Sequence, residues 1–405
     1  MRLDVECVIA GGGPAGMMLG LLLARAGRRV AVLEKHRDFL RDFRGDTIHP
    51  STLELLHELG LLEDFLKLPH QRVSELEAQF GGLSFPVADF SRLPVHCPFI
   101  ALIPQWDFLD FLAEKAARYP GFELVMQAEA KTLLYKDGRV SGVSGATSDQ
   151  ALEVHANLVV GADGRHSTLR EQAGLEVLDL GAPIDVLWFR LSRRPDDPQA
   201  TMARFGGGQL MVMLNRGDYW QCAFVIAKGS LELVRSRGLD AFRARLTRSV
   251  PFAADRMGEI ASWDQLKLLT VQVNRLRQWH RPGLLCIGDA AHAMSPVGGV
   301  GINLAIQDAV AAANVLWKGD FSPASLQAVQ ARREFPTRIT QAFQVMVQNN
   351  VLARVLADET ALEAPLAVRL LSRWPLLRRV PARMVGLGAR PEHVRSPAAS
   401  TAVAA

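Results

Sequence analysis

The sequence has few cysteines, no long apolar run and no long block of like charges. Its four cysteines lie far apart and form no Cys-x-x-Cys pair, so we expect neither a disulfide framework nor a metal site, and we expect a reducing compartment, the cytoplasm. No apolar run reaches the roughly 18 residues of a spanning helix. A strand starts at the N-terminus, so we expect no signal peptide. No run of like charges exceeds three residues, which argues against a nucleic-acid partner.

The bulk composition is that of an ordinary globular protein. The 405 residues suffice for two or three domains or one composite α/β body, and 49% of them are hydrophobic against 22% charged. The net charge is +4 and the isoelectric point lies near 9.0. Such a mildly positive protein suits anionic cofactors and small acidic or phenolic ligands.

The first 34 residues predict a strand, a glycine turn, a helix and a second strand. An apolar strand at 8–10 runs into Gly-Gly-Gly-Pro-Ala-Gly at 11–16, and an apolar helix follows at 17–26. The second strand begins at Val30 and ends on Glu34. This βαβ unit carries G-x-G-x-x-G with an acid about 20 residues later, which is the pattern of a dinucleotide site.

Each part of this unit has a physical role. Gly11 permits the tight turn, Gly13 lets the backbone approach a pyrophosphate, and Gly16 allows close packing of helix on strand. The helix N-terminus offers unpaired N–H groups and the positive end of its dipole. Glu34 can accept hydrogen bonds from a ribose 2′-OH and would repel a 2′-phosphate, which predicts FAD or NAD as the bound nucleotide. The predicted cofactor-binding residues of this unit are Gly11, Gly13, Pro14, Ala15, Gly16, Glu34 and Lys35.

Two more glycine-rich turns follow apolar strands further along the chain. The first is Gly-Ala-Asp-Gly-Arg-His-Ser at 161–167, and the second is Gly-Asp-Ala-Ala-His at 288–292. The second continues through Pro-Val-Gly-Gly-Val-Gly-Ile-Asn at 296–303, which puts bare backbone N–H groups at the start of an apolar helix. Since the chain holds one full fingerprint, these turns are candidates to complete the same nucleotide site.

These three motifs, in this order, resemble those of the class A flavoprotein monooxygenases, the FAD-dependent aromatic hydroxylases of the p-hydroxybenzoate hydroxylase type. The resemblance spans about residues 3–320, and two smaller matches are Arg44 in Arg-Gly-Asp-Thr-Ile-His and Gln105 before a helix. It implies an α/β fold with a Rossmann-like FAD-binding domain of the glutathione-reductase type, an inserted β-sheet substrate domain and a helical C-terminus.

The resemblance also implies roles for single residues. Asp289 would accept hydrogen bonds from the ribityl chain, and the Asp163-Gly164 turn would touch the ribityl–pyrophosphate region, although either aspartate could instead cap a helix or turn. Arg44 and Gln105 would contact FAD, and His292 would support the site rather than act as an acid. The residues implied along the flavin edge near N1 and O2, where a helix N-terminus stabilises negative charge, are Gly299, Gly301, Ile302 and Asn303, with Pro296 beside the substrate.

The activity implied by the resemblance is hydroxylation of an aromatic or polycyclic phenolic substrate. NAD(P)H would reduce FAD, O₂ would add at flavin C4a, and the outer oxygen of that hydroperoxide would pass to the ring while the other leaves as water. The choice between NADH and NADPH (NAD or NADP) stays open, because Glu34 concerns the FAD ribose. Two rivals are a flavin reductase or dehydrogenase of the same fold that never activates oxygen, and a non-catalytic nucleotide-binding partner protein.

Substrate-facing residues are expected on the second, inserted sheet. Trp188 and Arg190 share one face of a predicted strand. We take Arg190 and Trp220, together with Pro296, as candidate catalytic residues, while the question of which strand faces meet the flavin stays open. An inward-pointing Arg190 or Arg204 would favour an acidic or phenolic substrate, and a ring of Met, Trp and Phe would favour a bulky aromatic or polyketide ligand.

The predicted domains are discontinuous. The FAD-binding domain is expected to comprise 1–70, 98–180 and 275–320, and the substrate domain 71–97 and 181–274. Helices are expected at 321–395, followed by a disordered tail at 396–405. Within the FAD-binding domain, short strands between 122 and 155 predict a β-meander.

The basic, leucine-rich stretch 366–388 has two interpretations. Its leucines could pack on the body with its arginines in water, or the stretch could lie on a membrane surface or on another subunit. We therefore expect peripheral membrane contact at most and no spanning segment. The oligomer is expected to be a monomer or a homodimer.

Overall fold

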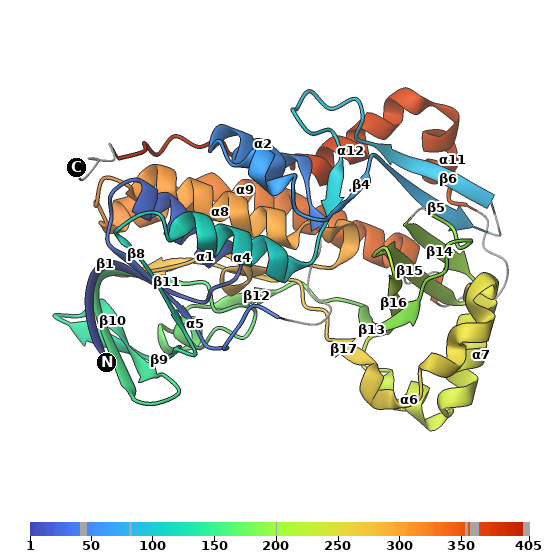
Figure 1. Cartoon of the computed structure of the whole chain (residues 1–405), viewed down its shortest axis with the longest axis horizontal. Coiled ribbons are helices and arrows are strands. Elements are labelled where there is room, and N and C mark those ends of the chain that lie inside the picture. The colour runs from blue at the N-terminus through green and yellow to red at the C-terminus, as the bar shows by residue number, and fades with distance from the viewer. Residues whose placement is uncertain (41–46, 81–82, 200, 353–354, 357–363, 400–405) are drawn as a thin grey trace.

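Two large sheets and a layer of long helices make up the protein. The computed structural model describes residues 1–40, 47–80, 83–199, 201–352, 355–356 and 364–399. Long helices cover one side of the first sheet, and the second sheet stands at the opposite end of the molecule, beside the last helices (Figure 1).

The first sheet is a largely parallel sheet with the N-terminal strand inside it. Among the described residues it has eight strands: β19 (His280–Arg281), β20 (Leu284–Cys286), β11 (Ala151–Gly161), β1 (Arg2–Ala10), β2 (Val30–Glu34) and β8 (Phe122–Met126), with β10 (Arg139–Ala146) and β9 (Glu129–Lys136) as a hairpin beside β11. β1 runs parallel to β2 and β11, and β11 runs parallel to β20. Because parallel strands end at one edge of a sheet, the turns after β1, β2, β11 and β20 gather there.

The residues of β2 and of the helix before it explain why this helix packs closely on the sheet. β2 is five consecutive buried residues, Val-Ala-Val-Leu-Glu, as in strands covered on both faces. Helix α1 (Pro14–Arg25) begins with a proline at its first turn and buries residues 15–24. A Cβ on Gly20 would lie 2.7 Å from Val32 Cγ2 and 2.9 Å from Phe122 Cε2. The absence of a side chain at Gly20 therefore sets the distance between helix and sheet.

Helix α8 (Gly301–Leu316) is the central helix of the layer and packs against α1 and α9 (Pro323–Val347). With its preceding turn, Val297–Leu316, it is long and apolar enough to cross a membrane by length and composition, at a mean hydropathy of 1.3. We expected no such segment from the sequence. Since 78% of that window is buried inside the protein, its surroundings are those of a core helix.

The second sheet is mostly antiparallel. Among the described residues it holds seven strands, in the order β17 (Lys267–Leu269), β13 (Ile184–Ser192), β16 (Tyr219–Ala227), β15 (Gln209–Asn215), β14 (Met202–Gly206), β5 (Glu75–Phe80) and β6 (Leu83–Asp89). One face packs Phe189, Met213 and Phe224 against α7 (Leu239–Ser249) and the 3-10 helix η1 (Pro251–Glu259). The opposite face packs Val186 and Trp188 against residues of the C-terminal half of the chain.

Short elements connect the two large sheets. Two small sheets consist of β12 (Val177–Asp179), β18 (Asn274–Leu276) and β21 (His292–Ala293), and of β3 (Thr47–Ile48), β7 (Ile100–Leu102) and β4 (Gln71–Val73). The remaining described helices in this part of the chain are α2 (Pro50–Glu58), α3 (Leu62–Phe65), α4 (Gln105–Ala116), α5 (Thr168–Gln172) and α6 (Leu231–Ser236), with 3-10 turns η2 (Trp263–Gln265), η3 (Gly288–Ala290) and η4 (Val297–Gly299).

The C-terminal part is helical and returns to the first domain. After α9 come a π-helical turn (Gln348–Leu352), α11 (Leu366–Arg373), the 3-10 turn η6 (Pro375–Arg378) and α12 (Arg379–Gly386). The prediction of a disordered tail from 396 is wrong for its first residues. The Ser396 N–H donates to Asn314 Oδ1 at 3.0 Å, and the Ala399 N–H donates to the Arg25 carbonyl at 2.8 Å. Residues 400–405 lie outside the described part.

The predicted β-meander is also wrong in part. β8 pairs in parallel with β2 rather than with its neighbour in sequence, and the last strand of the expected meander is continuous with the apolar strand before the turn at 161, so that the two form one strand, β11. The antiparallel pairing of β9, β10 and β11 remains. Local turn signals revealed the hairpin, whereas the β2–β8 pairing joins segments some ninety residues apart, which no local pattern encodes.

Candidate functional site

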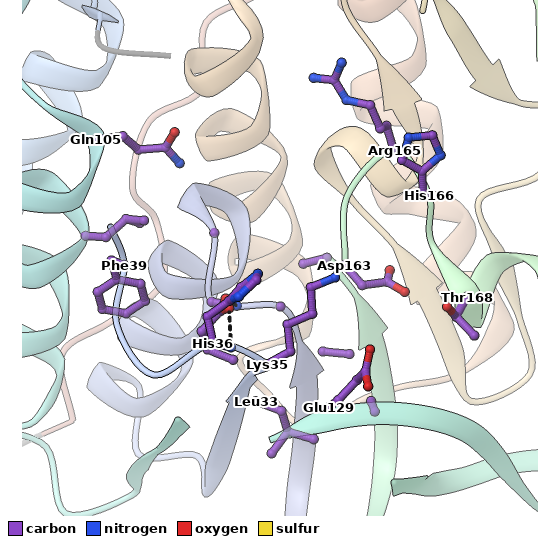
Figure 2. A pocket seen from close by; sticks show the side chains of 18 of the residues that line it. Leu33, Lys35, His36, Phe39, Gln105, Glu129, Asp163, Arg165, His166 and Thr168 are labelled. Carbon is purple, nitrogen blue, oxygen red and sulfur yellow. Dashed lines mark hydrogen bonds between the residues drawn. The ribbon is translucent and has the colours of Figure 1, made fainter. Parts of the chain in front are cut away.

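A cavity of about 610 Å³ lies where the parallel strands of the first sheet end. Figure 2 shows side chains from β2, α4, β9 and the loop after β11 around it. Two strands of the second sheet contribute Trp188 and the stretch 267–270, so the cavity lies between the two sheets. Its volume is that of sites for ligands of cofactor size. The sequence-predicted residues that line it are Gly11, Gly13, Glu34, Lys35, Gln105 and Asp163.

The first glycine turn forms the floor of the cavity. Gly11 has a φ of +108°, its N–H donates to the Leu33 carbonyl at 2.8 Å, and a Cβ there would meet the Ala162 carbonyl oxygen at 2.3 Å. Gly13 caps α1, and a Cβ built on it would meet no atom within 4 Å. The open space beside Gly13 and the N–H groups of the first turn of α1 fit a phosphate group, which is the arrangement a diphosphate requires.

Glu34 stands at the end of β2 with its carboxylate at the cavity wall. Its Oε2 accepts from the Gly12 N–H at 3.1 Å and its Oε1 from the His36 N–H at 3.0 Å, and the residue is buried. Two backbone donors therefore fix the carboxylate next to the glycine turn. A carboxylate at this position is suited to accept a hydrogen bond from a ligand hydroxyl. Pro14 and Ala15 occupy the first positions of α1, as predicted.

The second motif supplies the opposite wall. Asp163 Oδ2 accepts from the Leu169 N–H at 3.3 Å, while its Oδ1 is buried with no hydrogen-bond partner among the described residues. Burial raises the pKa of Asp163 above its ordinary value. A buried acceptor of this kind fits a ligand donor in the cavity. Gly164, the next residue, has a φ of +87°, which makes the tight turn possible.

The third motif meets the second through an ion pair. Arg165, which lines the cavity, places Nη2 3.4 Å from Asp289 Oδ2. The neighbouring Gly288 N–H donates to Asp308 Oδ2 at 3.0 Å. All three glycine turns therefore gather at one edge of the first sheet, as the sequence predicted.

A buried charge cluster around Asp308 holds the third glycine turn in place. Asp308 Oδ2 also lies 2.6 Å from His292 Nε2, and its Oδ1 accepts from Arg333 Nε at 2.9 Å. Arg333 in turn pairs with Glu392 at 3.2 Å. Burial acts to raise the pKa of Asp308, but His292 and Arg333 outweigh it and hold that pKa below its ordinary value. His292 thus acts beneath the site, in agreement with the supporting role expected from the sequence.

The N-terminus of α8 is attached to β3 and α2. Asn303 Oδ1 accepts from the His49 N–H at 2.9 Å and from Thr52 Oγ1 at 2.7 Å, and the Gly299 carbonyl accepts from Thr47 Oγ1 at 2.9 Å. The Asn303 side chain is therefore already hydrogen-bonded within the protein. Any contact of this turn with a flavin would come from its backbone N–H groups. Gly301 and Ile302 start α8, and Pro296 precedes the 3-10 turn η4.

The structure contradicts Trp220 as a candidate catalytic residue. Its ring is fully buried on the face of the second sheet covered by α7 and η1, and its Nε1–H donates to Asp197 Oδ2 at 2.9 Å. Arg204 lies toward the same helices, since it donates to the Ser249 carbonyl. Arg190 is exposed, with its guanidinium 4.8 Å from the Tyr219 ring centre. Sequence alternation identified which residues share a face, but not which layer covers that face.

One predicted site residue lies outside the described residues, and several cavity residues were not predicted. Arg44 is in residues 41–46, outside the described part, so the structure says nothing of it. Conversely, several cavity residues were missed. Arg165 lies inside a recognised motif and could have been found as a cation beside two aspartates; the others come from loops and from the second sheet, without a motif. The missed lining side chains include His36, Phe39, Glu129, Arg165, His166, Thr168 and Lys267.

Comparison with known proteins gives one consistent family. The model of the family described as "FAD binding domain" matches residues 4–342. The chain is 35% identical over 400 residues to a 6-methylpretetramide 4-monooxygenase of Streptomyces rimosus, covering 96% of this chain and 94% of that protein. It is 30% identical to a 12-dehydrotetracycline 5-monooxygenase/anhydrotetracycline 6-monooxygenase of the same species, over 82% of this chain and 67% of that one.

Solved structures show the same fold at low sequence identity. The p-nitrophenol 4-monooxygenase of Pseudomonas putida superimposes with a TM-score of 0.77 at 21% identity, covering 96% of this chain and all of that one. A protein of Pseudomonas aeruginosa described as "a probable FAD-dependent monooxygenase" gives a TM-score of 0.73 at 22% identity, with 87% of this chain and 98% of that one covered. A further relative, found by sequence and not among the solved structures, is an uncharacterized aromatic compound monooxygenase of Bacillus subtilis, which is 29% identical over 342 residues and of which this chain spans 62%.

Proposed function

Since the chain belongs to the FAD binding domain family and is an FAD-dependent monooxygenase, we propose that it hydroxylates a polycyclic phenolic, polyketide-like substrate. The observation that carries this proposal is that the first two motifs line one cavity and that the third is joined to it by the 3.4 Å pair between Arg165 and Asp289. The printed substrates of the two Streptomyces relatives support the substrate class.

FAD is the cofactor, and NAD(P)H is the reductant typical of the family. Bound FAD supplies two-electron exchange with NAD(P)H and the reduction of O₂. The overall balance is substrate, O₂, NAD(P)H and one proton giving hydroxylated product, water and NAD(P)⁺.

In this proposal each motif holds one part of FAD. The first turn of α1 beside Gly13 binds the diphosphate, and Glu34 binds the adenosine ribose. Asp163 and Asp289 accept hydrogen bonds from the ribityl–diphosphate region, with Arg165 holding Asp289 in place. The first-turn N–H groups of α8 face the pyrimidine edge of the flavin and stabilise negative charge there. The further residues proposed to contact FAD are Gly11, Pro14, Ala15, Gly16, Lys35, Arg44, Gln105, Gly164, Gly299, Gly301, Ile302 and Asn303.

We assign substrate binding to the second sheet, with residues 71–97 and 181–274 as the substrate domain. Residues 1–70, 98–180 and 275–320 form the FAD-binding domain in this division, and 321–395 the C-terminal helices. The face of the sheet that carries Trp188 packs against Val297, the residue after Pro296. That contact supports Pro296 as a residue beside the substrate. Arg190, on the same strand and with its exposed guanidinium, remains a candidate for contact with a phenolate.

The test is oxygen consumption by the purified protein. Supplied with FAD and NAD(P)H, it should bleach the flavin absorbance, and an aromatic polyketide substrate should gain one oxygen atom while O₂ is consumed. A same-fold reductase would bleach without substrate-dependent O₂ uptake, and a non-catalytic nucleotide-binding protein would not bleach. We place the enzyme in the cytoplasm, a location supported by four buried free cysteines, as a monomer or homodimer.

A further inference from the structure

An exposed apolar surface lies on the segment that follows α9. We name residues 366–380, which comprise α11, η6 and the start of α12, the C-terminal ridge. Single exposed apolar residues are ordinary, but a cluster of them marks an interaction surface. The exposed side chains of the ridge are Leu366 (72%), Trp374 (54%), Leu376 (66%), Leu377 (40%) and Val380 (69%). The interpretation in which the leucines of this stretch pack on the body is therefore wrong for Leu366, Leu376 and Leu377.

The same segment is strongly basic. Residues 364–390 include six arginines and no aspartate or glutamate. Arg373 and Arg379 flank the exposed Trp374-Pro375-Leu376-Leu377 run and are themselves exposed. Apolar side chains with arginines beside them match a surface that presents anionic groups above an apolar layer.

The inner side of the ridge is fixed to the protein. Val368 of α11 packs on the hydrophobic cluster that contains Phe80 and Ala78 of β5. Arg378 ties the η6 turn to the end of α11, because its Nε donates to the Leu371 carbonyl at 2.9 Å and its Nη2 to the Ser372 carbonyl at 2.6 Å. The exposed outer side is thus held in one conformation rather than being a loose tail.

We propose that the C-terminal ridge docks the protein on an anionic lipid bilayer. Trp374, Leu376 and Leu377 enter the interfacial layer, where tryptophan is favoured, and the arginines contact anionic headgroups. A second copy of the chain fits less well, because a two-fold dimer through the ridge would bring the arginines of both copies together without acidic partners. The docking does not depend on the proposed substrate.

The experiment is vesicle sedimentation of the full chain. One set of vesicles contains phosphatidylcholine alone, and the other contains phosphatidylcholine with phosphatidylglycerol. We expect at least about tenfold tighter binding to the anionic vesicles, weakened when the ionic strength rises from about 0.1 M to about 1 M. The variant Leu376→Ser/Leu377→Ser and the variant Arg373→Glu/Arg379→Glu should each lose this binding by at least about tenfold.

Control variants separate docking from folding. Leu233→Ser with Arg237→Glu changes an exposed leucine of α6 and the exposed arginine just after this helix, and this variant should bind vesicles as the original chain does. Circular dichroism and the melting temperature establish that each variant is folded. The blue shift of tryptophan fluorescence on anionic vesicles should disappear in Trp374→Phe.

Three outcomes would overturn the proposal. The first is a folded original chain that sediments with neither kind of vesicle. The second is binding that the ridge variants leave unchanged. The third is concentration-dependent self-association, seen by light scattering, that the ridge variants abolish, since this would assign the surface to a second copy.

Discussion

Two glycines of the first turn differ in what surrounds them, and this separates a ligand-facing position from a structural one. Gly13 borders open space, whereas a Cβ on Gly11 would overlap the Ala162 carbonyl. We expect Gly13→Ala to lower the free energy of unfolding by less than about 1 kcal/mol, the usual cost at a helix N-cap. Its FAD affinity should fall at least about tenfold, because the methyl group enters the space proposed for the diphosphate. Titration of the apoprotein with FAD measures this affinity, and denaturant unfolding measures the free energy of unfolding.

Gly11→Ala is the matched comparison. Strain at positive φ and the close carbonyl should lower the free energy of unfolding by about 2 kcal/mol or more, which denaturant unfolding detects. If Gly13→Ala bound FAD as tightly as the original chain, the diphosphate would not lie at this turn.

Trp220 offers a test of the corrected assignment. Its ring packs on the helix-covered face and its indole N–H donates to Asp197, which also pairs with Arg256. Trp220→Phe should therefore lower the free energy of unfolding by about 1–3 kcal/mol, from the lost hydrogen bond and the smaller ring. The turnover number at saturating substrate should stay within about twofold, which is less than about 0.5 kcal/mol of barrier. A large loss of turnover with unchanged stability would restore Trp220 to the active site.

His49 predicts a pH effect on stability. Burial lowers its pKa from 6.5 to about 4, so the folded state holds the neutral ring while the unfolded state takes up a proton below pH 6.5. The stability from this site is complete above the unfolded pKa and falls by at most about 1.4 kcal/mol per pH unit as the pH drops toward 4.

Denaturant unfolding between pH 7 and pH 4 measures that slope. His49→Asn removes the titrating ring and keeps a residue suited to the N-cap of α2, so its stability should depend less on pH over this interval. If the free energy of unfolding fell equally with pH in the original chain and in His49→Asn, His49 would not be a buried neutral ring.

At the scale of elements, the contact of α8 with α9 rests on buried charge. Asp308 of α8 accepts from Arg333 of α9 and holds the Gly288 N–H beside Asp289. Asp308→Asn should lower the free energy of unfolding by about 3–5 kcal/mol, because the Arg333 guanidinium keeps a weaker partner. FAD affinity should fall as well, since the turn that presents Asp289 loses its anchor.

Glu334→Gln, on α9 next to Arg333, is the control for Asp308. Its pair with Arg338 is 4.0 Å long and lies near the surface, so its removal should change stability by less than about 1 kcal/mol. If Asp308→Asn and Glu334→Gln lowered the free energy of unfolding equally, the buried charge cluster would contribute no more to stability than an exposed ion pair.

Elements with local signals could be predicted, and those decided by distant partners could not. The β1–α1–β2 unit is encoded by its glycine turn and apolar runs, and the structure has it as predicted. The pairing of β8 with β2 was missed because the two strands are far apart in sequence and become neighbours only when the sheet forms. The face of β16 was missed because α7, which covers it, lies further along the chain.

At the scale of the whole molecule, the cavity combines elements from the stretch of sequence between Ala10 and Thr270. Gly11 and Thr270 both line it, although they follow strands of different sheets. The motifs predicted which turns would gather, since parallel strands end at one edge. The participation of Trp188 and Lys267 depends on how the second sheet is placed relative to the first. No local sequence pattern encodes that placement. This contact is also where substrate and cofactor would meet.

A crystal structure of the protein grown with FAD would show whether the three glycine turns hold one FAD. We predict the diphosphate at the first turn of α1 beside Gly13, a ribose hydroxyl on Glu34, and the ribityl chain within hydrogen-bond reach of Asp289. A flavin bound away from Asp289 and the start of α8, or a colourless protein that refuses added FAD, would contradict it.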